Sequence, residues 1–152
     1  MSSTTVETFT VGVFKDVAWA LRGLEALERQ GFPRESLSVI AKESPELAPV
    51  TSKVGAAGDA FLDLPELGRC LACGPLVVTL QRGRGDLTQK GLAACMRLAG
   101  FQSHDGHIYE TLTGRGGILV AVRSEPRAAD ALATLQAYGG GNAAIGAWHG
   151  RV

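Results

Sequence analysis

The chain has 152 residues, 45% hydrophobic and 20% charged, a composition typical of a folded domain with its own core and not of a disordered chain. Its 15 basic and 15 acidic residues cancel, so the basic excess that usually accompanies nucleic-acid binding is absent. Its longest apolar run, residues 71–80, is about half of the ~20 residues that a membrane span needs. The N-terminus does not resemble a secretory signal, so we expect a cytoplasmic protein with free thiols.

The N-terminal part of the chain predicts a β-α-β unit. Apolar and polar residues alternate over Thr8–Phe14, which is the period of a strand. Asp16 can cap a following helix through its carboxylate, and leucines continue at helical spacing up to Gly31, a residue that tolerates the positive φ of a helix end. A second strand is expected over Leu37–Ala41, so the first unit spans residues 8–43.

The central segment, residues 44–116, is predicted to be a linker followed by a mostly helical insertion. Residues 44–60 show no clean period. Residues 64–80 resemble a helix of small residues that is broken near Gly74, and residues 87–99 resemble a better helix. Because their apolar stripes cannot face water, we expect this insertion to pack on the open face of the sheet or on a partner chain.

The C-terminal unit, residues 117–149, repeats the plan of the first. An apolar run over Ile118–Val122 predicts a strand that is covered on both faces. Ser124 and Pro126 begin a helix, and Ala144–Trp148 forms the last strand.

The two units align without a gap, with their caps, leucines and terminating glycines in register. This indicates an internal duplication. The alternative is that unrelated β-α-β units share such caps, leucine spacings and terminating glycines. Right-handed crossovers favour a ferredoxin-like, four-stranded sheet with both helices on one face. The predicted fold is therefore a single α/β (α+β) domain over residues 1–152, with a duplicated β-α-β core.

The cysteines and histidines carry the sharpest chemical motif of the chain. Cys70 and Cys73 could share one zinc ion or form a redox pair, and Cys95, His104 and His107 could complete a set of soft ligands. However, only one tight pair is present, and no strand precedes Cys70 as thioredoxin-like chemistry would require. Buried structural thiols are the favoured interpretation, with no cofactor, and zinc binding or redox pairing remains the alternative.

Other catalytic patterns are weak. A phosphate cradle needs a strand before it and a helix after it, but the glycine-rich run 114–117 precedes a strand. The run 83–85 lacks the Lys-Ser/Thr signature of such a cradle, so both runs are predicted to be turns. No Ser-His-Asp order and no pair of carboxylates in an apolar setting is evident. We therefore expect no catalytic residues and no enzymatic activity.

Three segments carry a family resemblance: VGVFKDVAWALRGLEALERQGFPRESLSVIA, GPLVVTL and IYETLTGRGGILVAVRSE. In this order they resemble the bacterial general stress protein, or heat-induced stress protein, family. The resemblance implies two β-α-β pieces around an apolar, Gly/Ala-rich middle and a link to stress responses, and it supplies no catalytic residues. The middle of this chain is more polar than that of the family, with Arg69, Gln81 and Arg82, which disfavours association with a membrane.

Three functional hypotheses follow. The first is a non-enzymatic, stress-associated protein that forms a homo-oligomer or binds a protein partner. The second is a metal or thiol sensor that uses Cys70, Cys73 and Cys95. The third is a small-ligand regulatory domain with its site at the seam between the two β-α-β units.

Overall fold

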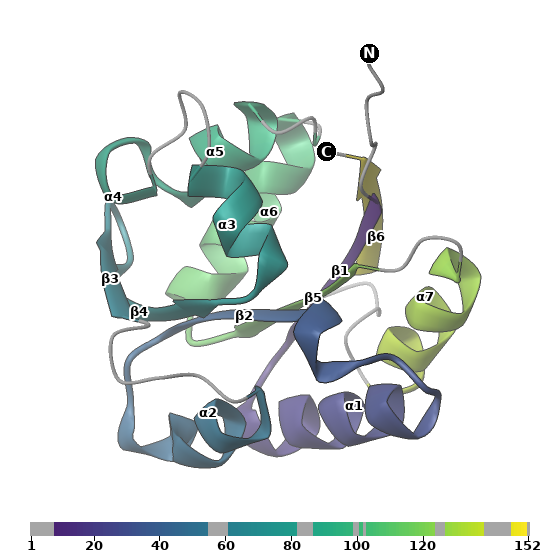
Figure 1. Cartoon of the computed structure of the whole chain (residues 1–152). Coiled ribbons are helices and arrows are strands. Elements are labelled where there is room, and N and C mark those ends of the chain that lie inside the picture. The colour runs from purple at the N-terminus through teal and green to yellow at the C-terminus, as the bar shows by residue number, and fades with distance from the viewer. Residues whose placement is uncertain are drawn as a thin grey trace.

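The computed structural model describes residues 8–54, 61–81, 87–98, 101, 103–123, 127–138 and 147–151. Within these residues, six strands form one sheet: β1 (Thr8–Phe14), β2 (Leu37–Lys42), β3 (Phe61–Leu64), β4 (Gly68–Cys73), β5 (Ile118–Arg123) and β6 (Ala147–Arg151). Their order across the sheet is β3-β4-β2-β5-β1-β6, and every neighbouring pair is antiparallel. Helices lie on both faces, so the chain has an α+β fold (Figure 1).

The elements near the N-terminus lie where the sequence predicts them. β1 has the predicted bounds, and helix α1 (Val17–Arg29) follows it. The Asp16 carboxylate accepts the N–H of Trp19 at 2.9 Å, which satisfies one of the free amides of the first turn. Gly31 closes the helix with a φ of 95°. A short 3-10 helix, η1 (Arg34–Ser36), then leads into β2.

One face of the sheet is covered by α1, α2 (Ala48–Val54) and α7 (Ala128–Ala137). α2 follows the 3-10 helix η2 (Pro45–Leu47). The core of this layer is buried and mainly aliphatic. It includes Leu24, Leu27, Val50, Val120 and Leu135, together with Phe14 and Phe32. Apolar burial of this kind is the main stabilising term for such a layer.

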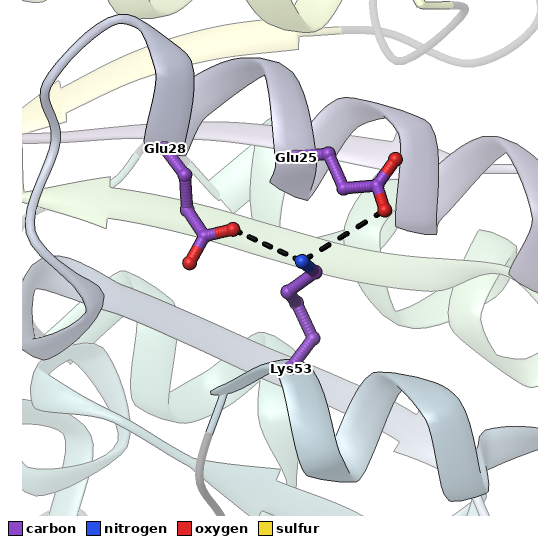
Figure 2. Close-up of polar contacts among 3 residues, drawn as sticks. All are labelled: Glu25, Glu28 and Lys53. Atoms are coloured by element: carbon purple, nitrogen blue, oxygen red, sulfur yellow. Dashed lines mark hydrogen bonds and ion pairs between the residues drawn. The ribbon is translucent and has the colours of Figure 1, made fainter.

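A charged contact also joins α1 to α2. Lys53 reaches from α2 to two carboxylates of α1, at 3.1 Å from Glu28 and 3.8 Å from Glu25 (Figure 2). The Glu25 side chain is 50% exposed and the Glu28 side chain 33%, so water screens the attraction. The apolar contacts of α2 therefore hold it in place more than this ion-pair cluster does.

The other face is covered by α3 (Pro75–Gln81), α4 (Leu87–Lys90), α5 (Leu92–Leu98) and α6 (Ser103–Gly114), above the sheet in Figure 1. Their buried side chains include Leu76, Leu80, Leu92, Met96 and Tyr109. The prediction that the central insertion covers the open face is thus confirmed, and the covering is supplied by the chain itself. Among the described residues, Val78 is the one large apolar side chain that is exposed, at 54%.

The prediction of a helix over residues 64–80 is wrong for most of its length. β3 and β4 form a hairpin there, and β4 pairs with β2, with Ile40 opposite Ala72. Both faces of β4 are covered, so its sequence lacks the polar alternation that distinguishes a half-buried strand from a helix. The sheet therefore has six strands in the described part of the chain, where four were predicted.

Two other predicted boundaries also change. The helix expected over residues 87–99 is divided into α4 and α5 at Gly91, which has a φ of 88°. The carboxylate of Glu110, on α6, then accepts the N–H of Ala93 at 3.2 Å and caps α5. The last strand, β6, begins at Ala147, and residues 124–126 and 144–146 lie outside the described part of the chain. None of the described helices is long and apolar enough to cross a membrane.

Candidate functional site

The two cysteines of the Cys-x-x-Cys motif lie on β4 and face opposite sides of the sheet. Cys70 is buried in the core beneath α3, α5 and α6, whereas Cys73 packs against the layer of α1 and α7. This follows from strand geometry, because successive side chains alternate between faces and residues three apart point in opposite directions. With β4 intact, Cys70 and Cys73 cannot ligate one ion or form a disulfide with each other.

The other candidate ligands are dispersed as well. Cys95 is buried on α5, in the same core cluster as Cys70, and His107 is exposed on α6. The His104 side chain lies outside the described residues. Within the described part of the chain, no group of three or more His, Cys, Asp and Glu side chains is placed to hold a metal ion.

The thiols are also poorly suited to redox or ligand chemistry. Burial raises the pKa of Cys70 to about 11, with smaller opposing effects of the Lys42 and Asp63 charges. Burial likewise raises the pKa of Cys73, partly offset by a hydrogen bond with the backbone of Val39. The thiolate is the reactive and metal-binding form, so both side chains are neutral at pH 7. These properties support the interpretation of Cys70 and Cys73 as structural thiols.

A more promising site is an open cleft of about 630 Å³ where β1 and β2 end and β5 begins. Phe14 of β1 lies opposite Ile118 of β5, and Ile40 of β2 lies opposite Leu119. If the pairing of β2 with β5 is continued by one residue beyond Ile40 and Leu119, the end of β2 lies beside Ile118, on the side of β5 opposite to β1. Lys15 and Lys42 therefore emerge on either side of the first residues of β5, close to the turn that precedes it. We call this site the seam cleft.

Two helix ends of opposite polarity adjoin the seam cleft. The first residues of α1 line it, and Asp16 caps this positive end of the helix dipole. The Gly114–Gly116 turn also lines it, and here the negative end of α6 is capped by Lys42, whose Nζ donates to the Gly114 carbonyl at 3.3 Å. Each helix end thus carries a side chain of complementary charge.

The glycine-rich turn of the cleft is a helix cap. The N–H of Gly117 donates to the Leu112 carbonyl at 2.9 Å, and the N–H of Gly116 donates to the Thr113 carbonyl at 3.1 Å. Gly116 has a φ of 98°, the left-handed conformation that commonly ends a helix. Because these amides are directed back to α6, they do not form a phosphate cradle, and the prediction of a turn is confirmed.

Six charged residues of the described part of the chain line the seam cleft: Lys15, Asp16, Lys42, Glu43, Glu46 and Arg115. Three of them already have partners: Asp16 and Lys42 cap helices, and Glu43 accepts from Arg69 Nε at 3.1 Å. Lys15, Glu46 and Arg115 are exposed and make no side-chain hydrogen bond or ion pair with any described residue. The cleft therefore presents two cationic groups and one carboxylate that are not otherwise engaged.

A second open pocket, of about 830 Å³, is lined by residues of η2 and α2 and by Phe61. Glu43 is its one charged lining residue among those described, and the Glu43 carboxylate is directed to Arg69. Ligand sites usually combine an apolar wall with several converging polar groups. Among the described residues, the other polar side chains of the larger pocket are the hydroxyls of Ser44, Thr51 and Ser52. The described lining of this pocket therefore offers no charged group that is free to bind a ligand, and the seam cleft is the better candidate.

The sequence alone did not identify Lys15, Lys42, Glu46 or Arg115. A signal was present, because Lys15 and Lys42 directly follow two correctly predicted strands. Without the pairing partners and the register, however, nothing indicated that the ends of these strands lie beside the turn at residues 114–116.

Comparison with known proteins adds no relative to this picture. No family model matches the chain, and no curated protein or solved structure matches it. The resemblance to the bacterial stress protein family therefore stays a prediction from the three segments that carry it.

Proposed function

We propose that this protein is a non-enzymatic regulatory domain that binds a small molecule in the seam cleft. The observation that carries the proposal is the convergence of three loops on a cleft of about 630 Å³, within the usual size range of ligand sites. Leu47 and Ile118 are buried and supply apolar lining, while Lys15, Glu46 and Arg115 supply polar groups. Ser44 is the one hydroxyl among the described lining residues. Its Oγ accepts the N–H of Glu46 at 3.1 Å, and no described histidine lines the cleft to activate it, which fits binding better than serine-type nucleophilic catalysis.

The proposal includes a ferredoxin-like, duplicated core. In support, β2, β5, β1 and β6 are consecutive neighbours and antiparallel, with the first strand of each unit in the centre. The crossover helices α1 and α7 also lie on the same face. In this interpretation β3 and β4 extend the sheet beyond β2, and the seam cleft lies at one end of the junction between the two repeats.

A role in a bacterial stress response, in the cytoplasm, is part of the same proposal. Its support is the resemblance of the three segments in order. The test is a gene deletion in a strain that makes the protein under heat and oxidative stress. Unchanged survival of the deletion strain under both stresses would count against this role but would not affect the ligand proposal.

Thermal-shift screening of small metabolites tests the ligand proposal. We expect at least one compound class to raise the Tm of the wild type by several degrees, because a ligand that binds only the folded state stabilises it. The cleft variant Lys15→Gln/Arg115→Gln should lose this response. Arg34→Gln/Lys90→Gln, which removes the same charge from exposed positions on η1 and α4, should keep it. No response in the wild type, or an equal response in both variants, would refute the proposal.

Self-association is a second candidate, favoured by the edge of the sheet. β3 is one of the two outermost strands of the described sheet and pairs with β4 on one side, and its Phe61 and Leu62 are only partly buried. An edge strand presents unpaired backbone groups that can pair with a second copy. Light scattering at high protein concentration should then give twice the 15.9 kDa of one chain. A monomer mass at every concentration would exclude this route.

A further inference from the structure

We infer that the seam cleft selects a small molecule with two negative charges and one ammonium group, the charge pattern of an acidic amino acid or of a phosphorylated amine. This inference rests on the proposed function and adds the chemical class of the ligand. It is drawn from the charges that remain at the site once the contacts within the protein are accounted for.

The charges that already have partners set the first constraint. Asp16 accepts the N–H of Trp19, and Glu43 pairs with Arg69 outside the cleft. Lys42 donates one hydrogen to the Gly114 carbonyl, and an ammonium group has three donors. These three residues shape the site and hold its loops together, but their principal interactions are used within the protein.

The remaining charges set the second constraint. Lys15 follows β1, Arg115 lies in the turn before β5, and Glu46 lies on η2, so the three come from three different loops. Two cationic side chains can each bind one carboxylate or share a phosphate, and Arg115 can do so with two parallel hydrogen bonds. Glu46 supplies the acceptor for an ammonium group.

Ligands of a single charge sign fit less well. A dicarboxylate without an amine would leave Glu46 beside a negative ligand, with Asp16 and Glu43 lining the same cleft. A polyamine would meet Lys15, Lys42 and Arg115. Like charges at close range in a partly enclosed site oppose binding, so the mixed lining discriminates against both classes.

Calorimetric titration at constant ionic strength with two matched series of compounds tests the inference. The first series is L-glutamate, glutarate, which lacks the ammonium group, and L-glutamine, which lacks the second carboxylate. The second series is O-phosphoethanolamine and ethyl phosphate, which lacks the ammonium group. Comparing the two series shows whether the two negative charges of the ligand belong to a phosphate or to two carboxylates. We expect one of the two complete compounds to bind at least about tenfold more tightly than its incomplete analogues, the effect of one charged hydrogen bond.

Glu46→Gln is the diagnostic variant. This variant should bind the compound that carries the ammonium group about tenfold more weakly than the wild type does. It should bind the analogue without the ammonium group as tightly as the wild type does, or more tightly. The preference for the amine-bearing compound should therefore disappear. Glu35→Gln, at an exposed position on η1, is the matched control and should behave as the wild type. Because both positions are exposed, neither variant should alter folding, which circular dichroism checks.

The outcomes separate this inference from the proposed function. If glutarate or ethyl phosphate binds as tightly as its amine-bearing counterpart, the inference is wrong and the proposed function stands. The same holds if no compound of either series binds while another class of compound raises the Tm in the screen. If neither series binds and the screen finds no ligand, both are wrong.

Discussion

At the scale of single residues, the structure shows which buried polar groups are satisfied. Ser38 of β2 is fully buried, and its Oγ accepts the N–H of Leu76 at 2.9 Å, so a strand residue caps the start of α3. Gly74 makes this possible because it adopts a φ of 105° directly against the backbone of Leu37 and Ser38.

Ser38→Ala is expected to lower the free energy of unfolding by about 1–3 kcal/mol, because it leaves the buried N–H of Leu76 without an acceptor. Urea denaturation measures the change. Ser52→Ala, at an exposed position on α2, is the control and should change stability by less than about 0.5 kcal/mol. Equal effects of the two substitutions would show that the Ser38 contact has no energetic importance.

Thr113 presents the opposite case. Its side chain is fully buried on α6, and its Oγ1 has no hydrogen-bond partner among the described residues. Thr113→Val should therefore raise the free energy of unfolding by about 1 kcal/mol, since it replaces an unsatisfied hydroxyl by a methyl group of similar size. The matched control is Thr134→Val on α7, which removes a hydrogen bond of 2.9 Å to the Asp130 carbonyl and should not stabilise the protein. Destabilisation by Thr113→Val would indicate that this hydroxyl is satisfied.

The buried thiol of Cys70 predicts a loss of stability at alkaline pH. In the unfolded chain this thiol titrates near 9.0, and in the folded protein its pKa is about 11. Between these values the unfolded state has released a proton that the folded state retains, so the free energy of unfolding is at its full value below pH 9 and decreases as the pH rises towards 11. The contribution is about 2–3 kcal/mol. Denaturation at pH 8 to 11 should show a weaker decrease for Cys70→Ala, and parallel curves for wild type and variant would contradict the prediction.

At the scale of elements, some helices are stabilised by signals in their own sequence, and others depend on residues of neighbouring elements. α1 has a cap, a buried stripe and a terminating glycine of its own, whereas α3 depends on Ser38 and α5 on Glu110 for their caps. Short helices are marginal in isolation, so α2, α3 and α5 owe their stability to the layers in which they pack.

The attachment of α2 to α1 can be divided between its apolar and charged contacts. Val50→Ala should lower the free energy of unfolding by about 2 kcal/mol, because it removes buried methyl groups and leaves a cavity. Lys53→Met keeps most of the aliphatic chain and removes the ion pairs with Glu25 and Glu28, so it should cost less than about 1 kcal/mol. Chemical denaturation of both variants gives the comparison, and the reverse ranking would show that the charged contact dominates.

At the scale of the whole molecule, the two helical layers enclose the thiols on opposite sides of one sheet. Cys70 and Cys95 are 0% and 1% exposed, and Cys73 is only partly buried. The described elements β3, β4 and α3 to α6 of the central insertion complete the core that the flanking units alone would leave open.

Thiol labelling with an aromatic disulfide reagent tests this arrangement. In the native protein Cys73 should react first, whereas Cys70 and Cys95 should react only as fast as the molecule opens, because a buried, protonated thiol is inert. Mass spectrometry of the labelled peptides identifies the sites. Rapid reaction of Cys70 in the native state would revive the thiol-sensor hypothesis and contradict the packing described above.

The sequence by itself determined the elements whose signals are local. β1, α1, β2 and β5 could be predicted because alternation, a short apolar run over Ile118–Val122, a capping Asp16 and a terminating Gly31 act within a few residues of the backbone they control. β3 and β4 could not be predicted. Burial on both faces of β4 removes the alternation that marks a strand, and β4 lacks the β-branched residues of β5, whereas β3 has only four residues.

Only the tertiary structure decided what the motifs mean. Residues three apart share a face on a helix and point in opposite directions on a strand, so the assignment of Cys70 and Cys73 to β4 separates two thiols that the expected helix would have brought together. The seam cleft likewise depends on the antiparallel register that sets Lys15 and Lys42 around the start of β5. Pairing between strands that are distant in the sequence is a property of the whole sheet, and no local pattern of residues contains it.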